Sequence, residues 1–112
     1  MSGGRKPGMT PAQLTAILAE RLLGWRCTPD RFLTGERGWM PRWKFQPTNK
    51  LTDAIRTLEA ANPEAYSVVA GANGSFYARV SVAGAAAEAH ASTKPLAICL
   101  ALAKIIGVDV SQ

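Results

Sequence analysis

The chain has few of the residues on which disulfide-rich folds and metal sites depend. Its 112 residues include two cysteines, Cys27 and Cys99, and one histidine, His90. Two cysteines are too few for a disulfide framework, and these residues lack the spacing of zinc ligands. We therefore expect reduced thiols, no bound metal and no cofactor.

Long hydrophobic runs are also absent. The longest apolar stretch, 96–106, is interrupted by Lys104 and has roughly half the length needed to cross a bilayer. The N-terminal segment MSGGRKPGMT lacks the apolar region of a secretory signal. These features predict a protein of the host-cell cytoplasm that does not contact membranes.

The chain also lacks a recognisable set of catalytic groups. His90 stands in an alanine-rich segment without an identifiable carboxylate to orient it, and neither cysteine has a histidine nearby in sequence. The glycines of segment 71–74 precede a strand, whereas a phosphate-binding loop requires a helix there. We expect a binding protein and not an enzyme.

Positive charge is concentrated in the first half of the chain. The net charge is +5, and residues 1–50 hold nine Lys/Arg against three Asp/Glu, whereas residues 51–112 hold four against five. A basic half can attract nucleic acid, nucleotides or an acidic protein surface, or it can simply keep a small protein soluble. No helix-turn-helix or RNA-binding aromatic pattern occurs, so sequence-specific reading of nucleic acid has little support.

Three helices are predicted from apolar periodicity and end signals. Residues 1–9 read as a disordered lead-in. A capping box of Thr10 with Gln13 opens a helix over Pro11–Leu23, which Gly24 ends. A second helix, capped by Thr48 or Asn49, is expected over about 50–61, before Asn62-Pro63. A third starts at Ser92 or Thr93 and runs to Ile106 before Gly107; it is so apolar that we expect it at the centre of the core or in a dimer contact.

Strands are predicted where the apolar period shortens to two residues. The alternation in Trp39–Phe45 predicts a strand with Trp43 and Phe45 on its buried face, and a shorter strand is possible near Arg31–Leu33. Asn73-Gly74 joins Tyr66–Ala70 and Ser75–Val82 into a hairpin through a type I′ turn. The alanine-rich segment Gly84–Ala91 is interpreted as a strand end followed by a loop.

The order of these elements predicts an α+β fold. Residues 10–112 are expected to form one domain, in which an antiparallel sheet of three to four strands is layered with three helices in the order α-β-α-β-β-α.

Aromatic side chains with basic neighbours are the remaining functional feature. A ring can stack on a base while a nearby cation holds a phosphate. Lys94 also stands near a helix start, where backbone N–H groups favour anions. Trp43 and Phe76 are instead predicted to be core residues. The candidate ligand- or partner-binding residues are Trp25, Arg26, Trp39, Arg42, Lys44, Tyr77, Arg79 and Lys94.

A series of motifs occurs in an order that resembles a known family. It runs from LLGW (22–25) through WKFQPT (43–48), an amphipathic helix, a hairpin with FYA (76–78) and an alanine-rich segment to TKPLAIC (93–99). The series resembles the phage ABA-sandwich domain, a family of small bacteriophage and prophage proteins, and implies an antiparallel sheet layered with helices.

Two features depart from that family's pattern. Leu100 stands where a basic residue often follows the Ile-Cys pair, and the loop Cys27–Gly38 is long. More loosely, the chain resembles phage proteins that sequester the cyclic ADP-ribose signal of the Thoeris defence system, which are small oligomers that bind without chemistry. No pocket residue is transferred from that resemblance.

These observations lead to three functional hypotheses. The first is a phage or prophage homo-oligomer that counters host defence by sequestering a nucleotide-derived signal. The second is a protein-protein inhibitor of a host defence complex such as a CRISPR effector. The third is a non-specific nucleic-acid binder, whose affinity would fall steeply with salt.

Overall fold

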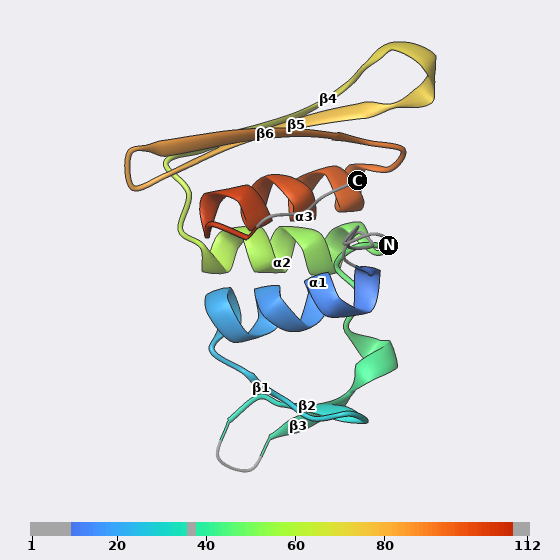
Figure 1. Ribbon diagram of the computed structural model, residues 1–112, viewed down its shortest axis with the longest axis vertical. Helices are drawn as coiled ribbons and strands as arrows, with labels where there is room; N and C mark the ends of the chain where they lie inside the picture. Colours follow the sequence, from blue (N-terminus) through green and yellow to red (C-terminus); the bar gives the residue numbers. More distant parts are fainter. Residues whose placement is uncertain (1–9, 36–37, 109–112) are drawn as a thin grey trace, which may run out of the picture.

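In the computed structural model, which describes residues 10–35 and 38–108, helices lie between two antiparallel sheets (Figure 1). The first half contains α1 (Pro11–Leu18), a π-helical turn (Ala19–Leu23), β1 (Arg26–Cys27), β2 (Arg31–Leu33) and β3 (Trp39–Pro41). The second half contains α2 (Leu51–Ala60), β4 (Ala65–Ala70), β5 (Phe76–Val82), β6 (Ala85–Ala91) and α3 (Lys94–Ile105). The prediction of disorder for 1–9 falls outside the described residues.

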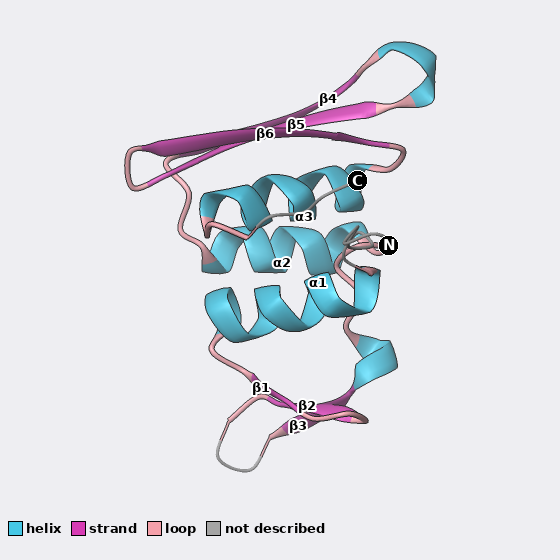
Figure 2. Cartoon of the chain, in the orientation of Figure 1, coloured by secondary structure: helices cyan, strands magenta, loops and turns pink. Residues whose placement is uncertain are grey.

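The predicted α+β class is confirmed, but the prediction of one sheet is wrong. Among the described residues, β1, β2 and β3 form one three-stranded antiparallel sheet, and β4, β5 and β6 form another. Figure 2 shows the sheets at opposite ends of the molecule, with the helices between them. The possible strand near Arg31–Leu33 and the strand start at Trp39 are confirmed, but sequence patterns did not show that they form a separate sheet, because its strands are only two or three residues long.

The ends of α1 and α3 form as their sequences predict. Thr10 and Gln13 make the reciprocal bonds of a capping box, and Thr93 caps α3 by accepting a hydrogen bond from the N–H of Leu96. Gly24 and Gly107, which follow the two helical segments, adopt φ values of 73° and 81°. A side chain at either glycine would be strained in this left-handed conformation.

The start of α2 differs from the prediction. Lys50, and neither Thr48 nor Asn49, occupies the N-cap, and its side chain makes no capping bond. Asp53 in the first turn instead accepts a hydrogen bond from the backbone N–H of Gln46 at 3.0 Å. The carboxylate therefore ties the helix start to the preceding loop, and the buried Thr48 packs inside.

The predicted strand Trp39–Phe45 is wrong beyond Pro41. The chain turns there into a short 3-10 turn over Arg42–Lys44, so alternate residues no longer share a face. Phe45 is 1% exposed, whereas Trp43 is 64% exposed. The prediction that Trp43 lies in the core is therefore wrong.

The segment predicted as a strand end and loop is a full strand, β6. Ala83 and Gly84 both have positive φ values, 51° and 84°, and form the tight turn that leads into it. Ala89 on its inner face is 4% exposed and lies in the core that contains most of α3. Alanine is a poor strand former, but its small side chain lets a helix approach the sheet closely.

Two separate cores hold the layers together. The larger core joins α3, β5 and β6 to buried leucines of α1 and α2, and α3 lies at its centre as predicted. The smaller core contains Ala19, Trp25, Phe32 and Phe45 and lies beneath the β1–β3 sheet.

Candidate binding surface

The pairing register of the β1–β3 sheet defines its outward face. Cross-strand partners point to the same side of a sheet, and Phe32, the partner of Cys27 and Met40, is fully buried. The alternate residues therefore point outward. We call them the tryptophan face, which consists of Arg26, Arg31, Leu33, Trp39 and Pro41.

Trp39 is the aromatic residue of this face. Its side chain is 56% exposed, and the guanidinium carbon of Arg31 lies 4.7 Å from a ring centroid. The other predicted member of this face, Arg26, is also exposed. Arg26 lies two strands away from Trp39, across Leu33. A face with one cation against a flat ring and a second cation on the same side of the sheet is suited to an aromatic anion, because the ring can stack and the cations can neutralise charge.

Asp30 partly neutralises the charge of Arg31. One carboxylate oxygen lies 3.2 Å from the guanidinium, and the other accepts a hydrogen bond from the Thr28 hydroxyl. The hydrogen bond from Arg31 is the main reason that the pKa of Asp30 is lowered, followed by the bond from Thr28. Asp30 therefore stays ionised and competes with any anion that approaches Arg31.

The aromatic core beneath the face fixes its shape. Trp25 packs against Phe45 and Phe32 with ring centroids 4.9 and 5.7 Å away, and only 8% of it is exposed. Arg56 of α2 covers the same indole, with its guanidinium carbon 5.0 Å from a ring centroid. Trp25, predicted as a contact residue, thus lies in the support beneath the face.

Arg42 and Lys44 differ in their surroundings. The guanidinium of Arg42 donates a hydrogen bond of 2.8 Å to the carbonyl of Thr28 and lies 4.8 Å from the ring centroid of Phe32. Lys44 is exposed, and its ammonium is 5.9 Å from a ring centroid of Trp43. Arg42 therefore links loop and core, whereas Lys44 and Trp43 remain available at the surface.

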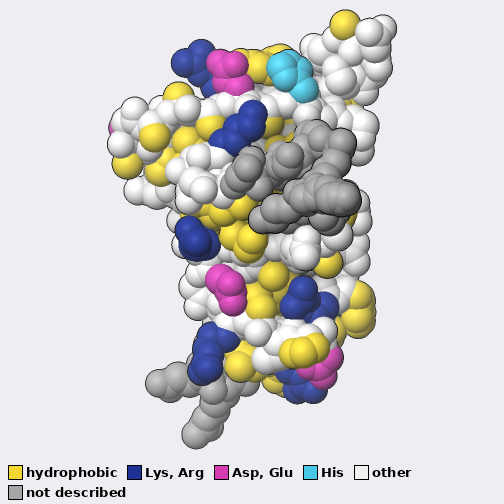
Figure 3. All heavy atoms as spheres, viewed as in Figure 1, with side chains coloured by type: hydrophobic (Ala, Val, Ile, Leu, Met, Phe, Trp, Pro, Cys, Tyr) yellow, Lys and Arg dark blue, Asp and Glu magenta, His cyan; other side chains and the backbone are white. Residues whose placement is uncertain are grey.

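The other predicted residues lie at the second sheet. Tyr77 and Arg79 point outward from β5, where Tyr77 contacts the ring of His90 and Arg79 faces Glu88 at 3.9 Å. Hydrogen bonding to Glu88 is the largest cause of the raised pKa of Tyr77. Figure 3 shows basic side chains spread over the visible face, several beside acidic ones.

Lys94 occupies a third position, at the start of α3. Its ammonium is 5.7 Å from the ring centroid of Phe76, a half-buried residue that packs against the larger core as predicted. The eight candidate residues therefore do not converge on one site. The fold brings Arg26 and Trp39 onto the tryptophan face, to which it adds Arg31, a residue that the sequence analysis did not select, and it brings Tyr77 and Arg79 onto the outward face of β5.

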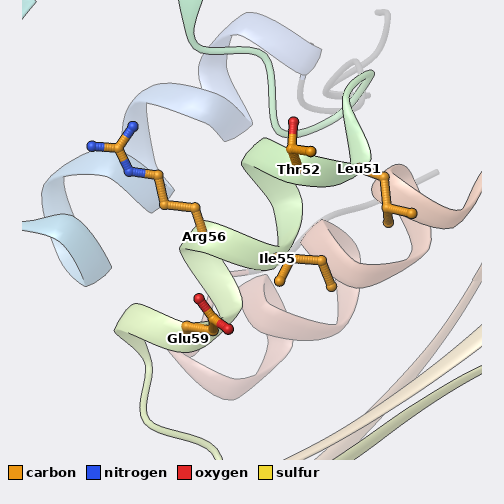
Figure 4. A pocket seen from close by; sticks show the side chains of 5 residues that line it. All are labelled: Leu51, Thr52, Ile55, Arg56 and Glu59. Carbon is orange, nitrogen blue, oxygen red and sulfur yellow. The ribbon is translucent and has the colours of Figure 1, made fainter.

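A shallow groove of about 340 Å³ runs along α2 (Figure 4). Leu51, Thr52, Ile55, Arg56 and Glu59 line it, and all of them belong to that helix. It is open to solvent, and none of the candidate residues lines it. The groove is therefore separate from the tryptophan face.

The thiols and the histidine lie in different surroundings. Burial raises the pKa of Cys99 to about 12, and burial followed by the charge of Glu20 raises the pKa of Cys27. Both thiols therefore favour the protonated form, which is a poor nucleophile. His90 is exposed on β6. Within the described residues, no three His, Cys, Asp or Glu side chains are grouped as metal ligands would be.

Comparison with protein families matches residues 16–102 to the model of the phage ABA sandwich domain. The chain belongs to this family. The match covers the end of α1, both sheets, α2 and most of α3, so the ABA sandwich domain accounts for most of the fold described above. A search of curated proteins finds no match.

A solved structure supports the ABA sandwich fold. The chain is similar to a phage protein from Bacillus cereus ATCC 14579, with a TM-score of 0.76, 17% identity and coverage of 96% of each chain. This likeness extends over both sheets and establishes the fold alone. In the described part of this ABA sandwich protein, no helix has the length and apolar character needed to cross a bilayer.

Proposed function

We propose that this phage ABA sandwich protein binds a nucleotide-derived ligand on the tryptophan face and acts by sequestering it. The half-exposed ring of Trp39, with the Arg31 guanidinium 4.7 Å from its centroid, carries the proposal. A base can stack on such a ring, and Arg26 and Arg31 can neutralise phosphate charge. Removing a nucleotide-derived signal from the cytoplasm would counter host defence without chemistry.

The proposed function involves no catalytic step, in keeping with the surroundings of His90 and Cys27. His90 contacts Tyr77, and the Cys27 thiol donates a hydrogen bond of 3.5 Å to the carbonyl of Ala16. The Cys27 pKa is raised, which disfavours the thiolate. These contacts support a role in binding, in which affinity and abundance, and not turnover, decide the effect on the ligand.

Titration calorimetry with cyclic ADP-ribose isomers and cyclic oligonucleotides tests the proposal. We expect Trp39→Ala to weaken binding by about tenfold or more, because stacking of a base on an aromatic ring contributes about 1–3 kcal/mol. Trp43→Ala is the matched control, since this tryptophan is 64% exposed, against 56% for Trp39, but lies outside the tryptophan face. The absence of heat with every nucleotide, or equal losses in both variants, would contradict the proposal.

Trp43 supports a second candidate function, inhibition of a host defence protein. Its side chain is 64% exposed, and exposed tryptophan and arginine residues are typical centres of protein-protein interfaces. A pull-down with a purified defence complex at low and high salt tests this idea. Binding that Trp43→Ala abolishes at both salt concentrations would favour the inhibitor over the signal-binding function.

DNA binding by the same protein and variants, measured over a range of salt concentrations, tests the third hypothesis, a non-specific nucleic-acid binder. Such a protein would bind DNA with an affinity that falls steeply as salt increases, because cations on the DNA are released on binding. The acidic partners of Arg31 and Arg79 reduce the free positive charge at both sheets. We therefore expect only weak DNA binding.

A further inference from the structure

The free edge of the β4–β6 sheet at β4 has a defined pattern of outward backbone groups. The carbonyls of Ser81 and Ser75 in and beside β5 accept hydrogen bonds from the N–H groups of Glu64 and Gly71, so both carbonyls face β4. Backbone groups alternate in direction along a strand. Ser67, for example, therefore bonds to β5.

The remaining β4 residues must direct their N–H and C=O groups away from β5. These residues are Tyr66, Val68 and Ala70. Among the described residues, β4 pairs with β5 alone. A row of unpaired donors and acceptors of this kind is a template for another strand.

The opposite edge, at β6, is occupied differently. The same alternation directs the backbone of Glu88 away from β5, and the ammonium of Lys104 donates a hydrogen bond of 2.6 Å to its carbonyl. A lysine that covers an edge in this way opposes pairing with another chain. This bond also confirms independently which residues of the sheet point outward.

The sequence of β4 contains none of the residues that usually protect an edge. AYSVVA has no charged residue and no proline, and Tyr66 and Val69 are 50% and 51% exposed. The charge nearest to β4 in sequence, on Glu64, accepts hydrogen bonds from Gly84 and Ser81 of its own sheet. Arg79, the cross-strand partner of Ser67, faces Glu88 on β6. Two copies of this strand can therefore approach without charge repulsion.

We propose that β4 is a dimer interface, at which it pairs antiparallel with β4 of a second copy about a twofold axis at Val68. The outward residues are symmetric about Val68. In this register Val68 therefore bonds to Val68 of the partner subunit, and Tyr66 and Ala70 of one copy bond to the partner's Ala70 and the partner's Tyr66. Every outward N–H and C=O is then used, and three strands from each copy form one continuous sheet.

The dimer does not depend on the proposed function. Its interface is a backbone edge at one end of the molecule, whereas the tryptophan face lies at the other end (Figure 1). Pairing therefore leaves both tryptophan faces uncovered, and each dimer presents two of them.

Proline substitution distinguishes the two edges. Ala70→Pro removes a donor that β5 does not use, so the fold remains while the dimer loses symmetric hydrogen bonds and meets a proline ring. We expect dimerisation of the full chain, measured by light scattering over a range of concentrations, to weaken at least about tenfold. Ala86→Pro makes the same change on the β6 edge and should leave the dimer intact; circular dichroism checks that both variants fold.

Cysteine crosslinking tests the register. Ser67 lies opposite Val69 of the partner subunit as a pair without hydrogen bonds, for which the Cα separation is about 4.5 Å and within disulfide range. Tagged Ser67→Cys and untagged Val69→Cys should form a mixed disulfide dimer, which neither variant forms alone. A wild type that stays monomeric at high concentration, equal effects of the two prolines, or crosslinking of Ser67→Cys to itself would overturn the proposal.

Discussion

The two sheets rest on cores of different chemistry and size. The β4–β6 sheet packs on α3 through small alanines and branched aliphatic side chains that reach into α1 and α2. The β1–β3 sheet closes over three aromatic rings with centroids 4.9 to 5.7 Å apart. The first is a large continuous core, and the second is a small cluster that supports a short sheet.

This difference separates stability from binding. Residues of α3 contact other elements on most sides, so little of that region can change without loss of packing. The aromatic cluster needs only its inward side chains, and the outward side chains of the same strands remain free for a ligand. The exposed tryptophans, Trp39 and Trp43, accordingly lie in the part of the molecule that is built on the smaller core.

The largest expected effect is in the larger core. Ile98 of α3 is fully buried, and Ile98→Ala removes methyl groups where the surrounding layers cannot collapse. We expect the free energy of unfolding to fall by about 2–5 kcal/mol, measured by urea denaturation. The half-exposed Leu51→Ala is the control, and a loss for Ile98→Ala no larger than for Leu51→Ala would refute the central role of α3.

A smaller and local effect is expected in the aromatic core. Phe45→Leu keeps an apolar side chain but removes the edge contacts with Trp25 and Phe32, so we expect a loss of about 1–2 kcal/mol. Amide hydrogen exchange should increase in β1–β3 while β5 stays protected. Equal loss of protection in both sheets would show that the two cores unfold as one.

Sequence patterns predicted the elements around the larger core better than those around the aromatic core. The capping box at Thr10, the Asn73-Gly74 turn and the apolar helix after Thr93 are local features, and each formed where the chain chemistry requires it. The strand β6 was missed because its alanines are explained only by the approach of α3, a contact between distant parts of the chain.

The candidate surface was predictable only in part. Trp39 was selected correctly as an exposed residue. Trp43 was predicted to be buried but is exposed, whereas Trp25 was predicted to contact a ligand but lies in the aromatic core. The 3-10 turn after Pro41 causes the first change, because it breaks the alternation on which the prediction depended. Arg31 could have been found from its place beside Phe32 in a short strand, had the alternation of that strand been followed.

The smallest predicted effect is on the free energy of unfolding at high pH, where Cys99 in the larger core is compared with Cys27 near the smaller one. The pKa of Cys99 in the folded protein is about 12, against an ordinary value of 9.0, so its stabilising contribution is complete below pH 9 and is lost as pH rises toward 12. Between pH 8 and 10 we expect the wild type to lose roughly 1 kcal/mol relative to Cys99→Ala. Cys27 also has a raised pKa but is partly exposed, so Cys27→Ala should follow the wild-type pH dependence more closely. Urea denaturation across this range measures the difference, and parallel curves for wild type and Cys99→Ala would show that α3 opens to solvent more readily than the larger core implies.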